Sequence, residues 1–306
     1  VYIDDIIIIA KDPMIYIKQL QFEYYLKGVG LPSYYLGGDV EMKNGKMIWS
    51  AKTYIKNICE RIEKMFEIKL RSQGSPMIQS YHPELDISDL LQGDMITKYQ
   101  MLIGAANWIV ILGRFDILYT VSTMARYSTM PRNGHLDALL RLFGYLKAYM
   151  KAKIIVDTSM PNVDGELTHH NWQEIYPYAH EELPPDMPIP KGKEVLMTTY
   201  VDADHAHDVV TRRSVTGLLM FLNNTPIKWY SKRQNTVETS TYGSELVAAR
   251  IASEMIIEVR YKLRMLGVPI HGPAQLYGDN QSVITNTTIP SSNLKKKHNA
   301  ISYHRV

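Results

Sequence analysis

The stretch Tyr200-Val201-Asp202-Ala203-Asp204 closes the apolar run 195–201, which has the composition of a buried β-strand. Asp202 therefore comes where a strand ends. Two other acids occupy similar places, since Glu245 lies near the start of a long helical pattern and Asp279 follows another short apolar run. Carboxylates at such positions can point into a cleft while their neighbours stay in a core. Three that converge would hold a divalent metal ion, because hard cations such as Mg²⁺ prefer oxygen ligands.

Residues 194–306 predict a mixed α/β unit, a class of fold in which ligands often bind at strand ends. Three strands come first, followed by a long helix that Gly267 terminates, a fourth strand and a short helix. The predicted strands are 195–201, 214–222, 226–231 and 274–277, and the long helix is 241–266. The alternative for each single acid is a helix cap or an edge charge without any metal.

Residues 1–70 predict a smaller α/β unit. Two β-branched runs within residues 1–10 flank Asp4 and Asp5, a pattern typical of a β-hairpin with two carboxylates at its turn. Such a turn suggests a binding site, because an unpaired buried carboxylate is costly, although an ordinary exposed turn is the alternative. The pattern then predicts a helix at 15–28, strands at 34–42 and 46–49 joined at Asn44-Gly45, and a helix at 53–66.

The middle of the chain divides into two further parts. Residues 71–156 predict a connector and then helices, because apolar residues recur at spacings of three and four over 99–127 and 135–150. Residues 157–193 contain six prolines and little periodicity, which indicates a linker or a long surface insertion. Several compact units are what 306 residues predict.

Composition excludes several classes of protein. A net charge of +3 is too small to attract a polyanion by itself, so a nucleic-acid surface would have to be local. Cys59 is the single cysteine, which excludes a disulfide framework and favours a reducing compartment. No apolar run approaches the length of a membrane span, so we expect no membrane partner. Val1 falls inside an apolar run, which suggests a segment cut from a longer protein.

The motifs form an ordered series along the chain. Tyr2-Ile3-Asp4-Asp5 comes first, then the segment 36–55, and then Arg114-Phe115-Asp116-Ile117 with 145–147. The last unit adds 200–204, 212–217, 229–234, 240–245, 279–282 and 297–304. In this order they resemble the copia-type retrotransposon Pol proteins, over nearly the whole chain apart from the proline-rich segment. An ordered series of motifs is far stronger evidence than any single one.

The resemblance implies a ribonuclease H-like domain at 194–306, preceded by the end of a reverse-transcriptase palm, a thumb and a helical connection. It implies that Asp202, Glu245 and Asp279 bind two Mg²⁺ ions, for which Mn²⁺ can substitute, and that Asp4 and Asp5 are polymerase metal ligands. The partners would be an RNA–DNA hybrid, whose RNA strand is cut, and primer–template nucleic acid. The expected location is intracellular, in cytoplasmic virus-like particles or the nucleus. Self-association stays open.

Several residues near these acids are candidates for contacts to nucleic acid. They are Arg212, Arg213, Lys232, Arg233, Gln234 and Asn280. The basic ones would neutralise phosphates beside a cleft, whereas the alternative is an exposed, solvated face. By the resemblance, His298 would position water or assist product release; the alternative is a solvated residue after the lysine run 295–297. His205 and His207 have no cysteine partner nearby, so we expect no zinc site there.

Departures from the family pattern leave a second hypothesis open. Ala300 stands where the family has an acid, so a fourth metal ligand is missing or lies beyond Val306, and the other palm aspartate belongs upstream of Val1. A two-metal site that lacks a principal ligand should lose most of its rate. We therefore expect no polymerisation by this chain alone, and hydrolysis as its own chemistry. The alternative is a non-catalytic, nucleic-acid-binding remnant of a decayed element.

Overall fold

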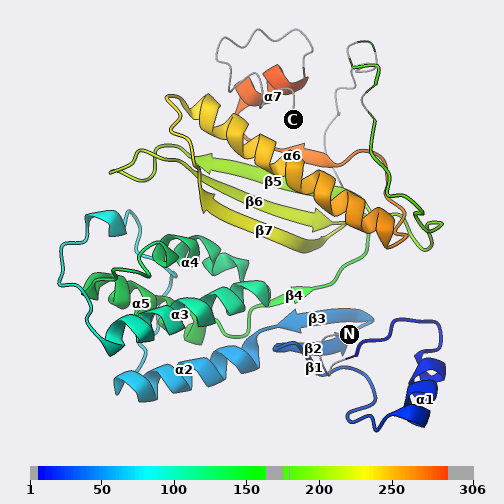
Figure 1. Cartoon of the computed structure of the whole chain (residues 1–306), viewed down its shortest axis with the longest axis horizontal. Coiled ribbons are helices and arrows are strands. Elements are labelled where there is room, and N and C mark those ends of the chain that lie inside the picture. The colour runs from blue at the N-terminus through cyan, green and yellow to red at the C-terminus, as the bar shows by residue number, and fades with distance from the viewer. Residues whose placement is uncertain (1–5, 163–173, 175, 179, 289–306) are drawn as a thin grey trace.

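The computed structural model describes residues 6–162, 174, 176–178 and 180–288. It is a mixed α/β structure with two four-stranded sheets, ordered β1-β2-β3-β4 and β7-β6-β5-β8. Figure 1 shows helix α6 (Thr241–Met265) over one side of the second sheet, while the first sheet and a group of helices lie along the other side. The α/β class predicted from the sequence is therefore confirmed.

The N-terminal half is a helical unit attached to the small sheet. Helices α2 (Lys52–Phe66), α3 (Asp94–Ile111), α4 (Leu118–Ala125) and α5 (Asn133–Ala148) turn their apolar residues toward one core. Ile55, Leu102 and Leu139 are fully buried there, because each belongs to the apolar stripe of its helix. The hydroxyl of the buried Tyr99 donates a hydrogen bond to the Met124 carbonyl at 2.8 Å, which ties α3 to the end of α4.

The small sheet contains β1 (Tyr34–Tyr35), β2 (Gly38–Lys43), β3 (Lys46–Ser50) and β4 (Lys153–Ile155). The strand predicted over 34–42 is interrupted, because Leu36 and Gly37 have positive φ angles of 47° and 85° and make a turn between β1 and β2. Strand β4 was not predicted. It pairs with β3 after the whole helical unit, with Ile154 opposite Trp49, and local pattern carries no information on such a distant partner.

The first residues also differ from expectation. The segment Ile6–Ala10 contains no strand, and Ile9 is 95% exposed, so the predicted hairpin is wrong in the part of it that is described. A β-branched run needs a partner strand to become a sheet, and this run has none among the described residues. Helix α1 (Pro13–Glu23) ends before the predicted Gly28 and buries none of its side chains.

The second sheet is built from β5 (Met197–Asp204), β6 (Val215–Leu222), β7 (Thr225–Arg233) and β8 (Gln275–Tyr277). Neighbours β5, β6 and β7 are antiparallel, whereas β8 runs parallel to β5. Alternate residues of β5, such as Val201 and Ala203, are buried in a core that they share with Ala248 and Ala252 of α6. None of the helices in the described ranges is long and apolar enough to pass through a membrane.

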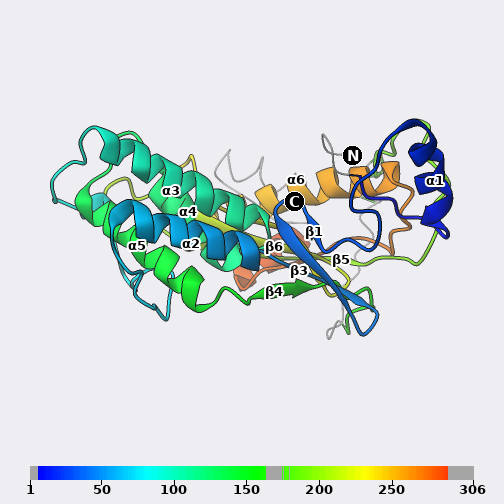
Figure 2. The same ribbon diagram turned by 90° about the horizontal axis from the view of Figure 1, so that it is seen from below.

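The two halves meet along β7. Helix α4 and strand β4 both contact β7, and Trp229 of β7 packs against the core of the helical unit. The Trp229 ring lies 5.4 Å from the ring of Phe115, which belongs to the short 3₁₀ helix η2 (Phe115–Ile117). Seen from below in Figure 2, the helices of the first half lie beside the strands of both sheets.

Candidate metal centre

Strand β5 presents Asp202 to solvent. Its neighbours Val201 and Ala203 point into the core, so the alternation of the strand turns Asp202 toward the opposite face, where its side chain is exposed. The residue opposite Asp202 on β6 is Gly217, and a Cβ atom placed there would come no closer than 3.9 Å to any neighbour. The space beside the Asp202 carboxylate is therefore open.

Helix α6 supplies Glu245 in its first turn. The Ser240 hydroxyl caps this helix by accepting a hydrogen bond from the Gly243 N–H at 3.3 Å. Glu245 is only 6% exposed, so its carboxylate lies at the inner side of the site.

Asp279 follows β8. Because β8 is parallel to β5 with Tyr277 opposite Tyr200, the chain two residues further on brings Asp279 to the level of Asp202. The next residue, Asn280, accepts hydrogen bonds from the N–H groups of Ser282 and Val283, both at 3.1 Å, and so caps helix α7 (Gln281–Thr288). The side chain of Asn280, which the sequence suggested for contact to nucleic acid, is engaged in that cap, and the contact to nucleic acid stays a prediction.

The three acids converge. One carboxylate oxygen from each of Asp202, Glu245 and Asp279 can be chosen so that all of them lie within 4.8 Å of one another. In the described part of the chain, no lysine or arginine forms an ion pair with any of the three. Burial, together with the charges of Asp202 and Asp279, raises the pKa of Glu245 to about 7. The cluster therefore carries negative charge that the described residues do not balance.

A groove of about 440 Å³ opens next to Asp202 on the outer face of the sheet. Its floor includes Asp202, Asp204 and Gly217, and its far wall is formed by the helical unit through Phe115, Leu118 and Tyr119. A substrate bound there would touch both halves of the molecule. Hard oxygen ligands beside an open groove suit Mg²⁺ better than a soft or fully enclosed metal site.

The other candidates have different environments. Arg212 and Lys232 are exposed and Arg213 is partly exposed, which leaves them accessible. Arg233 instead donates a 2.7 Å hydrogen bond to the buried carboxylate of Asp208. Gln234 is 3% exposed, and its amide donates to the Thr216 hydroxyl at 3.0 Å and to the Ser244 carbonyl at 2.9 Å. In this structure Gln234 braces the start of α6, and its contact to nucleic acid stays a prediction.

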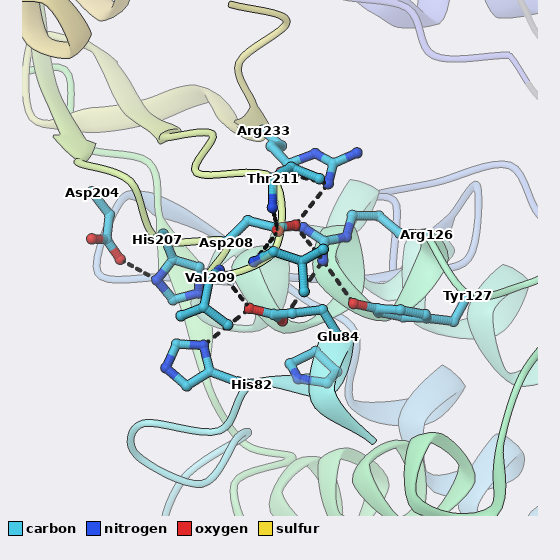
Figure 3. A network of polar contacts seen from close by, with 12 residues as sticks. His82, Glu84, Arg126, Tyr127, Asp204, His207, Asp208, Val209, Thr211 and Arg233 are labelled. Atoms are coloured by element: carbon cyan, nitrogen blue, oxygen red, sulfur yellow. Dashed lines mark hydrogen bonds and ion pairs between the residues drawn. The ribbon is translucent and has the colours of Figure 1, made fainter. Parts of the chain in front are cut away.

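Three predicted residues, Asp4, Asp5 and His298, lie outside the described residues, as does Ala300. The structure also reveals a polar network that the sequence did not indicate, around Asp208, Arg126 and Glu84 (Figure 3). Glu84 and Val209, which it joins, are 125 positions apart in the sequence. The loop between β5 and β6 contains a single acid, Asp208, and nothing in the local sequence points to the partners of that acid.

Three carboxylates from two strand ends and one helix start, beside an open groove, define a candidate divalent-metal centre on an α/β scaffold. No protein-family model matches the chain. It is 25% identical over 309 residues to the retrovirus-related Pol polyprotein from transposon RE1 of Arabidopsis thaliana, covering 100% of this chain and 18% of that protein. It is also 25% identical over 319 residues to the corresponding polyprotein from transposon TNT 1-94 of Nicotiana tabacum, covering 100% of this chain and 21% of that protein.

A putative transposon Ty5-1 protein of Saccharomyces cerevisiae is 25% identical over 270 residues, covering 85% of this chain and 72% of that protein. The predicted resemblance is therefore confirmed, since the relatives of this chain over its full length are copia-type retrotransposon Pol polyproteins. The chain spans about a fifth of the length of the plant relatives that it matches.

Proposed function

We propose that this chain carries a ribonuclease H-type nuclease of a retrotransposon Pol protein, which hydrolyses the RNA strand of RNA–DNA hybrids with Mg²⁺. The observation that carries the proposal is the convergence of Asp202, Glu245 and Asp279 within 4.8 Å. The relatives support the retroelement class, and the order of motifs supports this part of Pol. The segments before residue 194 would be the end of a palm, a thumb and a connection.

The donor set fits the proposed metal ions. Glu245 would hold a cation from the buried side, while the exposed Asp202 and Asp279 would hold it from the groove side. The raised pKa of Glu245 supports this, because a nearby cation is what would let all three carboxylates stay ionised together. When bound, paired Mg²⁺ ions activate a water molecule and stabilise the leaving oxygen of a phosphodiester.

The groove offers a place for the hybrid. The exposed side chains nearby include Arg212, in the loop before β6, and Lys232, in β7, and both of these strands contribute residues to the lining of the groove. They would contribute non-specific contacts to phosphates, with binding that weakens as the salt concentration rises. Recognition by duplex shape and 2′-hydroxyl groups would need no reading of base sequence. We do not propose polymerisation by this chain alone.

The test is cleavage of a hybrid whose RNA strand is end-labelled, in Mg²⁺, by the full chain. We expect Asp202→Asn to lower the cleavage rate by at least about 10³-fold, because it removes a metal ligand. The matched control is Asp94→Asn, which changes an exposed acid in the first turn of α3 and should leave the rate unaltered.

Absence of cleavage by the unaltered chain at every Mg²⁺ and Mn²⁺ concentration would contradict the nuclease. Hybrid binding that is retained and weakens steeply with salt would then support the non-catalytic remnant.

A further inference from the structure

The loop between β5 and β6 turns around one buried acid. Asp208 is 1% exposed, and its carboxylate accepts hydrogen bonds from the N–H groups of Val210 at 3.2 Å and Thr211 at 2.8 Å. Its backbone carbonyl accepts from the Arg212 N–H at 2.7 Å, and Arg212 itself has a left-handed φ of 55°. These bonds fix the shape of the loop from within.

Two residues of the helical unit, Arg126 and Glu84, bind the same loop. Arg126, at the end of α4, places a guanidinium nitrogen 3.1 Å from the Asp208 carboxylate and 3.9 Å from that of Glu84 (Figure 3). Glu84, in the 3₁₀ helix η1 (Pro83–Leu85), accepts a hydrogen bond from the Val209 N–H at 3.0 Å. Arg233 of β7 completes the charge balance of Asp208 from the other side at 2.7 Å.

The loop is also tied to the metal centre. Asp204 lies two residues after Asp202 in β5, and its carboxylate is 2.6 Å from Nδ1 of His207. The other ring nitrogen of His207, Nε2, is hydrogen-bonded to the hydroxyl of Tyr119 in α4. His205 Nδ1 lies 3.2 Å from the hydroxyl of Ser244, the residue before Glu245. The β5–β6 loop therefore connects the helical unit both to the end of β5, which carries Asp202, and to the start of α6, which carries Glu245.

We infer that Arg126 and Asp208 are positioning residues, through which the helical unit sets the relative placement of the ligands in the metal centre. The inference rests on the proposed function, because it takes the three acids to bind a cation. The physical reason is that Asp202 lies just before the β5–β6 loop, so the position of its carboxylate depends on the contacts that fix this loop. Groups that orient metal ligands without touching the metal commonly change affinity or activity by about 10- to 100-fold when they are altered.

The test compares variants of the full chain. For each we would measure the dissociation constant of Mn²⁺ alone, by electron paramagnetic resonance of the free ion, and kcat and KM on the hybrid. We expect Arg126→Gln to weaken Mn²⁺ binding and lower kcat, each by about tenfold, with KM changed by less than about twofold. Arg126→Lys keeps the charge and should recover part of both losses.

Two further variants make the outcome decisive. Arg250→Gln breaks a 2.8 Å ion pair with Glu254 on the surface of α6 and should change neither quantity. Tyr119→Phe removes one hydroxyl, and with it the contact to His207, so it tests the same coupling if Arg126→Gln does not fold. We expect it to weaken Mn²⁺ binding severalfold while the melting temperature falls little.

Mn²⁺ affinity and kcat that stay at their unaltered values in every folded variant would overturn the inference, whatever happens to the melting temperature. A chain that binds Mn²⁺ but cuts no hybrid would contradict the nuclease, while a weaker affinity in Arg126→Gln would still support positioning. A chain that binds no divalent cation would overturn both proposals.

Discussion

The candidate metal centre and the Asp208 network are two sites that contain buried acids and adjoin the end of strand β5, and the charges of these acids have opposite surroundings. Glu245 is buried against two further carboxylates, which with burial raise its pKa to about 7. Asp208 is also shielded from solvent, yet hydrogen bonds from Thr211 and Arg233 and the charge of Arg126 outweigh burial and lower its pKa to about 2. Both acids are buried, but the neighbours of Glu245 are carboxylates, whereas the neighbours of Asp208 are hydrogen-bond donors and arginines.

This difference separates a buried acid whose charge the protein itself balances from one whose charge the described residues leave unbalanced, as the proposed cation site requires. Asp208 is buried, but two arginines and backbone N–H groups bind its carboxylate, and these contacts help to fix how the two halves of the molecule pack. A buried acid whose neighbours are other acids costs stability until a cation arrives. Under the proposed function, the free energy of unfolding that this repulsion costs would be recovered when a cation binds.

The largest effect on stability should come from Asp208→Asn. The substitution leaves Arg126 and Arg233 without their shared carboxylate at a buried site, which typically costs about 3 to 5 kcal/mol. Urea denaturation of the full chain measures it. A loss below about 1 kcal/mol would show that solvent or Glu84 compensates the arginines, and the contrast would then be weaker than the geometry suggests.

The acid dependence of stability should be smaller, about 2 kcal/mol. The pKa of Asp208 is about 2 in the folded chain against an ordinary 3.8, so between these values the unfolded chain binds more protons and the free energy of unfolding rises with pH. The contribution is complete above about pH 4 and is lost as the pH falls through 2. Between pH 2.5 and 5, the total rise in the free energy of unfolding should be smaller in Asp208→Asn than in the unaltered chain by about 2 kcal/mol.

Glu245→Gln should have the opposite sign. In the absence of divalent ions it removes a buried charge that two neighbouring acids repel, so we expect stability to increase by about 1 to 2 kcal/mol at pH 8. Addition of Mg²⁺ should raise the melting temperature of the unaltered chain and have little effect on this variant. Equal Mg²⁺ responses in the two proteins would contradict a cation bound by Glu245.

The smallest effect should come from Glu258→Gln. Hydrogen bonds from Lys228 and Lys262 lower the pKa of Glu258 to about 2, much as at Asp208, but its side chain is 46% exposed. Solvent screens such a pair, so we expect a change below about 1 kcal/mol by thermal or urea unfolding. A change as large as that of Asp208→Asn would show that exposure is not what distinguishes these acids.

The parts of the molecule that could be predicted are those with a local cause. The apolar run of β5, the helical period of α6 and the end of α6 before Gly267 each depend on residues within a few positions, so the elements that carry Asp202, Glu245 and Asp279 were predicted nearly as they stand. The order of the motifs along the chain then suggested that the three acids lie close together, and one carboxylate oxygen from each does lie within 4.8 Å of the others.

The failures have a non-local cause. Ile6–Ala10 has the composition of a strand but no partner among the described residues, whereas Lys153–Ile155 became a strand because β3 offered a free edge. The structure turns Gln234 inward and pairs Arg233 with Asp208, contacts that the motif around them did not indicate, while their contact to nucleic acid stays a prediction. The network of Glu84, Arg126 and Asp208 joins three segments that are far apart in the sequence, so no local pattern predicts their contact.

By itself the sequence determined which acids stand at the ends of strands and helices, because hydrophobic period and capping are properties of neighbouring residues. Only the tertiary structure decided which of these acids would be neutralised. The energy of a buried carboxylate depends on the charges within a few ångströms of it, and for Asp208 and Glu245 those charges come mainly from other parts of the chain.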